Sequence, residues 1–185
     1  MKQSFHILSF ILFLLLFAAC ESSNCPLNNI VESVYVFYAS ERTADGTFQA
    51  GTSVKLQDTL TVTAFGTDSL LVNRLVGQSG AKLPVSYYQQ ADTLVFTFTD
   101  SQGATGYDTI CIEKDTRHHF DDPSCPVHMF HTVKDIHFTR HLIDTIIVSN
   151  ASINYDGAEN FQVYFRTTTD SSDQDTTSEE DGQDE

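Results

Sequence analysis

The stretch Asp92-Thr93-Leu94-Val95-Phe96-Thr97-Phe98 decides the fold class of this chain. Its residues Leu94, Phe96 and Phe98 fall at every second position, the spacing that places side chains on one face of a β-strand. The aspartate suits a turn, and the threonine after it suits the first position of a strand. The stretch therefore predicts a strand with one face in an apolar core.

The same opening recurs along the chain: Asp, then Thr or Ser, then Leu or Ile, any residue, and an apolar residue. The five copies begin at Asp58, Asp68, Asp92, Asp108 and Asp144. Alternation continues in Leu60/Val62/Ala64 and Ile110/Ile112. Further strands are predicted near residues 33–39, 52–56, 83–88, 127–133 and 161–166.

Short strands at this spacing, with no helical period of useful length in the mature chain, indicate an all-β sandwich or barrel. We favour an antiparallel, immunoglobulin-like β-sandwich over residues 31–166. The length of the chain favours a single domain.

The N-terminus has the pattern of a secretion signal. Lys2 precedes an apolar run over residues 7–17, which ends in Ala18-Ala19-Cys20. The run is shorter than the roughly 20 apolar residues of a membrane-spanning helix. Phe17-Ala18-Ala19-Cys20 resembles a bacterial lipoprotein box, in which the cysteine is diacylated, becomes the new N-terminus and is acylated again, as with palmitate.

This resemblance implies a lipoprotein signal peptide at residues 1–19 and a lipidated Cys20 with a linker at residues 20–30. The alternative is an ordinary signal peptide with a chance cysteine. We expect a lipid-anchored protein of the cell envelope, in the outer membrane, and the sequence leaves open whether it faces the periplasm or the cell surface.

Charge is unevenly distributed. The formal net charge is −15, and residues 167–185 contain eight acids and no base. A segment without apolar side chains cannot offset the entropy cost of ordering, so an acidic disordered tail is predicted over 167–185. Phosphate backbones would be repelled by both the tail and the domain, so no nucleic-acid partner is expected.

Three cysteines follow Cys20, in a setting where export favours oxidation: Cys25, Cys111 and Cys125. They allow one disulfide and one free thiol. A Cys25–Cys125 bridge would tie the start of the domain to a late strand. A Cys111–Cys125 bridge would require those two segments to form a hairpin.

Histidines form the one cluster with metal-binding chemistry. Six of the seven lie between residues 118 and 141, at positions 118, 119, 128, 131, 137 and 141. Zinc requires nitrogens that converge to about 2.0–2.1 Å. Neighbours on one strand cannot converge, so a site would combine His119 with His131 or His141. The alternative is ordinary solvated or hydrogen-bonded histidines.

The recurring pentads have a second interpretation. Asp followed by Ser or Thr and an aliphatic residue or Thr resembles the acceptor motif of general protein O-glycosylation in Bacteroidota. The candidate sites are Thr59, Ser69, Thr93, Thr109, Thr145 and Thr176. Tyr87-Tyr88 is a candidate sugar-stacking pair, of which one ring is expected to face the core and the other solvent.

Several stretches together resemble a known family. They include Cys20 with the nearby Cys25, Leu83-Pro84-Val85, His119-Phe120 and Thr139-Arg140-His141-Leu142-Ile143-Asp144. The chain resembles small Bacteroidota lipoproteins built on a single domain of unknown function, over about residues 20–165. The resemblance implies a β-sandwich lipoprotein without an assigned activity, favours the Cys25–Cys125 disulfide, and makes Cys111 a departure from the pattern.

No catalytic motif is found, so we expect a membrane-anchored, non-enzymatic module of the cell envelope. Its loops or a free strand edge would contact a protein or glycan partner, or it would serve structurally. No cofactor is required by this interpretation. The alternative function is a metal-binding protein or metal-dependent enzyme that uses the His118–His141 cluster and a divalent metal.

Overall fold

The computed structural model describes residue 25, residues 31–67 and residues 69–166. This part of the chain contains eleven strands and no helix. No helix within it is long and apolar enough to cross a membrane. The predicted signal peptide, Cys20, the acidic tail and Thr176 lie outside the described residues.

The first sheet is organised around the first strand, β1 (Glu32–Arg42). One side of β1 pairs with the last strand, β11 (Phe161–Phe165), which in turn pairs with β9 (Ile143–Val148). Its other side is shared: β5 (Gly80–Pro84) pairs with the N-terminal half and β2 (Phe48–Ser53) with the C-terminal half. The β1–β11 pair is parallel, and every other pair in the described strands is antiparallel.

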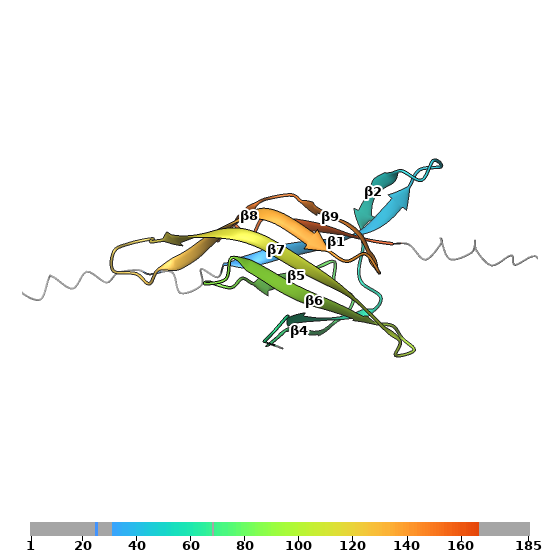
Figure 1. Cartoon of the computed structure of the whole chain (residues 1–185), viewed down its shortest axis with the longest axis horizontal. Coiled ribbons are helices and arrows are strands. Elements are labelled where there is room, and N and C mark those ends of the chain that lie inside the picture. The colour runs from blue at the N-terminus through green and yellow to red at the C-terminus, as the bar shows by residue number, and fades with distance from the viewer. Residues whose placement is uncertain (1–24, 26–30, 68, 167–185) are drawn as a thin grey trace, which may run out of the picture.

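The second sheet has six strands in the order β10-β8-β7-β6-β3-β4. Their bounds are Thr59–Ala64 for β3, Ser69–Leu75 for β4, Ala91–Thr99 for β6, Thr105–His119 for β7, His128–Phe138 for β8 and Ser152–Ile153 for β10. Figure 1 shows the long β7–β8 hairpin extending past one end of the molecule, while the β1–β2 hairpin projects from the other.

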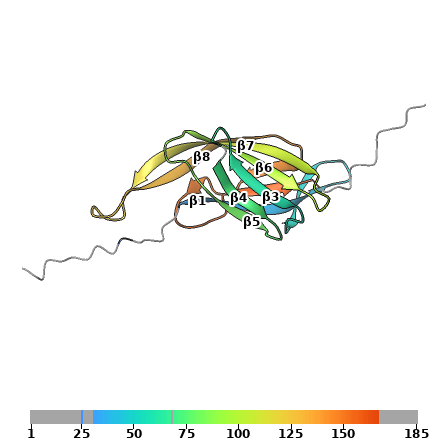
Figure 2. The same cartoon turned by 90° about the horizontal axis from the view of Figure 1, so that it is seen from below.

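The core lies between the inner faces of the two sheets, whose strands cross in Figure 2. Tyr35 of the first sheet is fully buried, with its ring 4.8 Å from that of Phe161 and 5.7 Å from that of Phe96. The alternating residues of β6 are buried as expected. The predicted all-β sandwich is therefore confirmed, with the two packed sheets of immunoglobulin-like domains and one parallel strand pair.

Several strand limits differ from those predicted. The strand expected at 83–88 ends at Pro84, because proline has no backbone N–H with which to continue a ladder. The strand expected at 52–56 ends at Ser53, and β8 continues five residues past Val133.

Three of the five pentad aspartates lie inside a strand and not before it: Asp92 in β6, Asp108 in β7 and Asp144 in β9. The carboxylates of Asp108 and Asp144 are also buried. Alternation in sequence does not reveal this difference, because the partners of these carboxylates are distant in the chain.

A disulfide joins Cys25 to Cys125, whose Cα atoms are 5.4 Å apart. This agrees with the pairing implied by the family resemblance. Cys111 is free and half-buried, and it lies opposite His137 in the β7–β8 register. The rival Cys111–Cys125 pairing was wrong: the two segments do form a hairpin, but Cys125 lies in its connecting loop.

Removing the disulfide should destabilise the domain. In the double variant Cys25→Ser, Cys125→Ser, the bridge no longer restricts the unfolded chain over a separation of 100 residues. We expect the free energy of unfolding to fall by about 4–5 kcal/mol, measured by urea denaturation. Cys111→Ser, which removes the free thiol, is the control, and an equal loss in both variants would contradict this prediction.

Candidate functional site

A large cavity opens at the end of the sandwich where the β1–β2 hairpin projects. It has a volume of about 760 Å³. Its apolar walls come from both sheets and from the loops that follow β2 and β8: Ala39, Val54, Leu56, Phe98, Leu142 and Phe165. Four polar residues complete the lining: Lys55, Gln57, Asp58 and Arg166. We call this the distal cavity.

The floor of the distal cavity is aromatic. The rings of Phe98 and Phe165 meet edge to face, with centroids 5.3 Å apart. Phe98 belongs to β6 and Phe165 to β11, so the contact joins the two sheets. Such an apolar floor with a few polar groups is typical of small-ligand and side-chain binding pockets.

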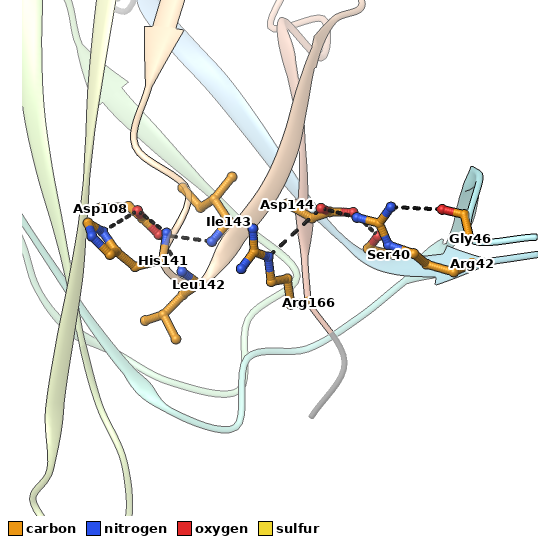
Figure 3. A network of polar contacts seen from close by, with 9 residues as sticks. All are labelled: Ser40, Arg42, Gly46, Asp108, His141, Leu142, Ile143, Asp144 and Arg166. Carbon is orange, nitrogen blue, oxygen red and sulfur yellow. Dashed lines mark hydrogen bonds and ion pairs between the residues drawn. The ribbon is translucent and has the colours of Figure 1, made fainter. Parts of the chain in front are cut away.

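Asp108 fixes one rim of the cavity (Figure 3). Its carboxylate accepts hydrogen bonds from the backbone N–H groups of His141, Leu142 and Ile143, at 2.7–2.8 Å. The Thr139 hydroxyl donates a further bond of 2.7 Å. Burial raises the pKa of Asp108, but these hydrogen bonds outweigh it and leave the pKa below its ordinary value.

Leu142 is held from a second side as well. Its carbonyl oxygen accepts a hydrogen bond of 3.0 Å from the backbone N–H of Arg166. The apolar Leu142 side chain and the cationic Arg166 side chain are therefore placed together on the rim of the cavity.

Asp144 forms the second half of the network in Figure 3. Its buried carboxylate accepts a hydrogen bond from the Ser40 hydroxyl. It also forms an ion pair with Arg42, whose Nη2 lies 2.5 Å from Asp144 Oδ1. Arg166 Nε lies 3.9 Å from the same carboxylate. Arg42 also donates to the Gly46 carbonyl, at 3.0 Å, which ties the β1–β2 turn to β9.

This geometry suits binding through shape and charge. Lys55 and Arg166 line the cavity against a single acid, Asp58, on a chain whose net charge is −15. An apolar group that carries a nearby anion complements such a site. Both buried carboxylates of the network are occupied by donors from the protein itself, so their role is to position the rim.

Comparison with known proteins identifies a family. The model described as "Family of unknown function (DUF6452)" matches residues 59–165, more than half of the chain. The chain belongs to the DUF6452 family. No curated protein and no solved structure matches it.

The DUF6452 match begins at β3 and ends at β11, so β1, β2 and Cys25 lie before it. Within the match fall Asp108, Asp144, Leu142 and Phe165. The matched region therefore supplies both buried carboxylates and the floor of the distal cavity, whereas Ala39, residues 54–58 and Arg166, which complete its lining, lie outside the match.

The structure does not bring the three predicted metal ligands together. In the register of the β7–β8 hairpin, His131 faces Thr116 and His119 faces His128, so His119 and His131 lie on opposite faces. His141 lies beside Asp108, eight positions from Thr116 along β7 or about 26 Å. Among the described residues, no group of three His, Cys, Asp or Glu side chains is arranged to hold a metal ion.

His119 and His141 have other contacts. The His119 ring stacks on Phe130, with centroids 4.1 Å apart, and its Nε2 lies 3.2 Å from Asp121. His141 Nδ1 lies 3.1 Å from the Asp108 carboxylate. These two histidines pack and hydrogen-bond within the domain.

His131 is the most unusual of the six. Its side chain is buried, its Nδ1 lies 2.9 Å from the Thr116 hydroxyl, and its Nε2 has no hydrogen-bond partner among the described residues. The nearby Lys114 ammonium, itself buried, contacts Asp92 at 3.2 Å and the Gln89 carbonyl at 2.6 Å. Burial and, secondarily, the Lys114 charge lower the pKa of His131 to about 4, with Asp92 opposing them.

The O-glycosylation candidates in the described part are placed as follows. Ser69 is exposed at the start of β4, whereas Thr59, Thr93, Thr109 and Thr145 are half-buried within strands. Modification of any of them stays a prediction.

The tyrosine pair differs from expectation. Tyr87 and Tyr88 are both exposed, because they lie in the loop after Pro84 and not on a strand. Their rings are nearly perpendicular, at 85°, so they do not form one flat platform for a sugar.

Sequence reasoning missed the distal cavity. Its floor residues Phe98 and Phe165 lie in predicted strands, as ordinary core residues do, and Leu142 is named only in a stretch that carries the family resemblance. The only available signal was the aspartate of two pentads, at Asp108 and Asp144, which was interpreted as turn chemistry.

Replacing Asp108 should loosen the rim. Asp108→Asn keeps the size of the side chain but puts an NH₂ group where N–H and O–H donors converge. We expect a loss of roughly 3 kcal/mol in the free energy of unfolding at pH 7, measured by urea denaturation. The control is Asp100→Asn, in the exposed β6–β7 turn, which should change stability little; a neutral Asp108→Asn would refute the anchoring role.

His131 should make the domain sensitive to mild acid. The unfolded state binds its proton near pH 6.5 and the folded state near pH 4, so stability is full above about 6.5 and falls as the pH drops towards 4. The expected loss is roughly 3 kcal/mol. His131→Gln should flatten this slope in urea titrations at several pH values, whereas the exposed His137→Gln should not; equal slopes in all three proteins would contradict the prediction.

Proposed function

We propose that this DUF6452 protein is a lipid-anchored binding module of the cell envelope that captures a protein segment in its distal cavity. The observation that carries the proposal is an open cavity of about 760 Å³ with an aromatic floor and a cationic rim. The segment would present an apolar side chain to Phe98 and Phe165 and a carboxylate to Lys55 and Arg166.

The membrane anchor is part of the proposal. It rests on the lipoprotein box at residues 17–20 and on the resemblance to Bacteroidota lipoproteins. We place the mature chain in the outer membrane, held by acyl chains on Cys20. Two or more acyl chains anchor a protein firmly in a membrane, whereas a single acyl chain gives only marginal membrane binding.

We also propose that the module is not an enzyme. The two buried carboxylates near the cavity accept hydrogen bonds from fixed donors of the domain, and neither is left to act on a ligand. His131, the titratable group with the most shifted pKa among the histidines, is not among the residues that line the distal cavity.

A charge placed on the rim tests the binding site. Leu142→Asp puts a carboxylate beside the apolar floor, where it would repel an acidic segment and hydrate the pocket. We expect peptides selected from a displayed random library on the wild-type protein to bind this variant at least tenfold more weakly, measured by titration calorimetry.

Ile147→Asp is the matched control, since Ile147 is 39% exposed and Leu142 is 36% exposed, and Ile147 does not line the cavity. Equal affinities of the selected peptides for the wild type and Leu142→Asp would show that the peptides bind outside the distal cavity. Failure to select any peptide would sink the proposal of a protein segment as the ligand.

A further inference from the structure

The tip of the β7–β8 hairpin extends beyond the strands that flank it, and the Tyr155 ring packs against its base at His119, His128 and Phe130. β6 pairs with β7 only as far as Glu113, and β10 pairs with β8 only at His131 and Thr132. Among the described strands, none adds to the hairpin over residues 117–130, which pair only with one another. In Figure 1 this hairpin forms one end of the molecule.

The disulfide ties this tip to the N-terminal segment. Cys125 lies in the loop that joins β7 to β8, and it is bonded to Cys25. Cys25 is five positions after Cys20, a distance of at most about 18 Å for a fully extended chain. If Cys20 carries acyl chains in a bilayer, the tip is therefore held at the surface of that bilayer.

The composition of the tip suits such a surface. Phe120 is 61% exposed and Val127 42% exposed, and they stand at the two ends of the loop, directly after β7 and directly before β8. Pro123 and Pro126, both exposed, restrict the chain between them.

The charge of the tip is small compared with that of the whole chain, which carries −15. Residues 120–127 hold two acids, Asp121 and Asp122, and no base, and Arg117 and Lys134 stand on the two strands that flank them. Residues 117–134 are therefore neutral in sum, and an anionic membrane surface would repel this end of the hairpin less than it repels the chain as a whole.

We propose that residues 120–127 rest in the interfacial region of the membrane that holds Cys20, with Phe120 and Val127 entering its apolar boundary. The contact rests on the proposed lipid anchor. It sets the orientation of the domain, because Tyr107 near the other end of β7 is 13 residues from Phe120, or about 43 Å along the strand. The distal cavity, which lies at that end beside Phe98, then faces away from the bilayer.

The chain contains no tryptophan, so a single indole can report on the contact. The experiment uses the full mature chain with Cys20 acylated, carrying Phe120→Trp, in vesicles of phosphatidylethanolamine and phosphatidylglycerol. The vesicles have either ordinary or brominated acyl chains, and bromine quenches an indole only at short range. We expect emission at least twofold lower in the brominated vesicles.

Tyr107→Trp is the matched control, since Tyr107 is 60% exposed at the far end of the same strand. Its emission should be equal in the two kinds of vesicle. Val127→Trp provides a second reporter on the tip, so that a defect caused by one substitution does not decide the result.

The outcomes separate this inference from the proposed function. Quenching at positions 120 and 127 but not at 107 supports the contact. Mass spectrometry that finds acyl chains on Cys20, together with unquenched reporters at the tip, overturns the inference and leaves the anchor in place. A blue-shifted but unquenched indole overturns it in favour of a protein-covered tip, and a chain without acyl groups overturns both.

Discussion

The carboxylate of Asp108 fixes the place where the chain leaves one sheet and enters the other. Asp108 belongs to β7 of the six-stranded sheet, and its hydrogen-bond donors belong to the segment that runs from β8 to β9 of the other sheet. A buried carboxylate without such donors would be costly. Because the donors are backbone N–H groups, the crossing has little freedom to adopt another path.

The path of this crossing segment also fixes the rim of the distal cavity. Ile143, the first residue of β9, is fully buried, and Asp144 follows it with its own set of donors. Arg42 links this pair of residues to the β1–β2 turn, and Arg166 links them to the end of β11. One face of the rim is therefore set by two carboxylates that accept hydrogen bonds from the domain itself, and Leu142, Lys55 and Arg166 line the cavity beside them.

The molecule also has two chemically different ends. One holds the disulfide, the hairpin tip and the aromatic contacts of His119 with Phe130. The other holds the distal cavity and the cations that surround it. Since β7 runs from one end to the other, a lipid anchor near Cys25 and a binding site near Phe98 would act on different surroundings without a second domain.

Much of the fold followed from local patterns, whereas the site did not. Alternation at Leu94, Phe96 and Phe98 predicts a strand and the face that it buries, because side chains of an extended backbone point alternately to opposite sides whatever the rest of the chain does. The same pentad at Asp92 and Asp108 reads alike in sequence. Only the tertiary structure decided that Asp108 is a buried acceptor, since its donors come from residues 139–143, about 30 positions away. The sequence by itself therefore determined the class of fold and the buried face of strands such as β6, and the packing of distant segments decided where a cavity opens and which charges line it.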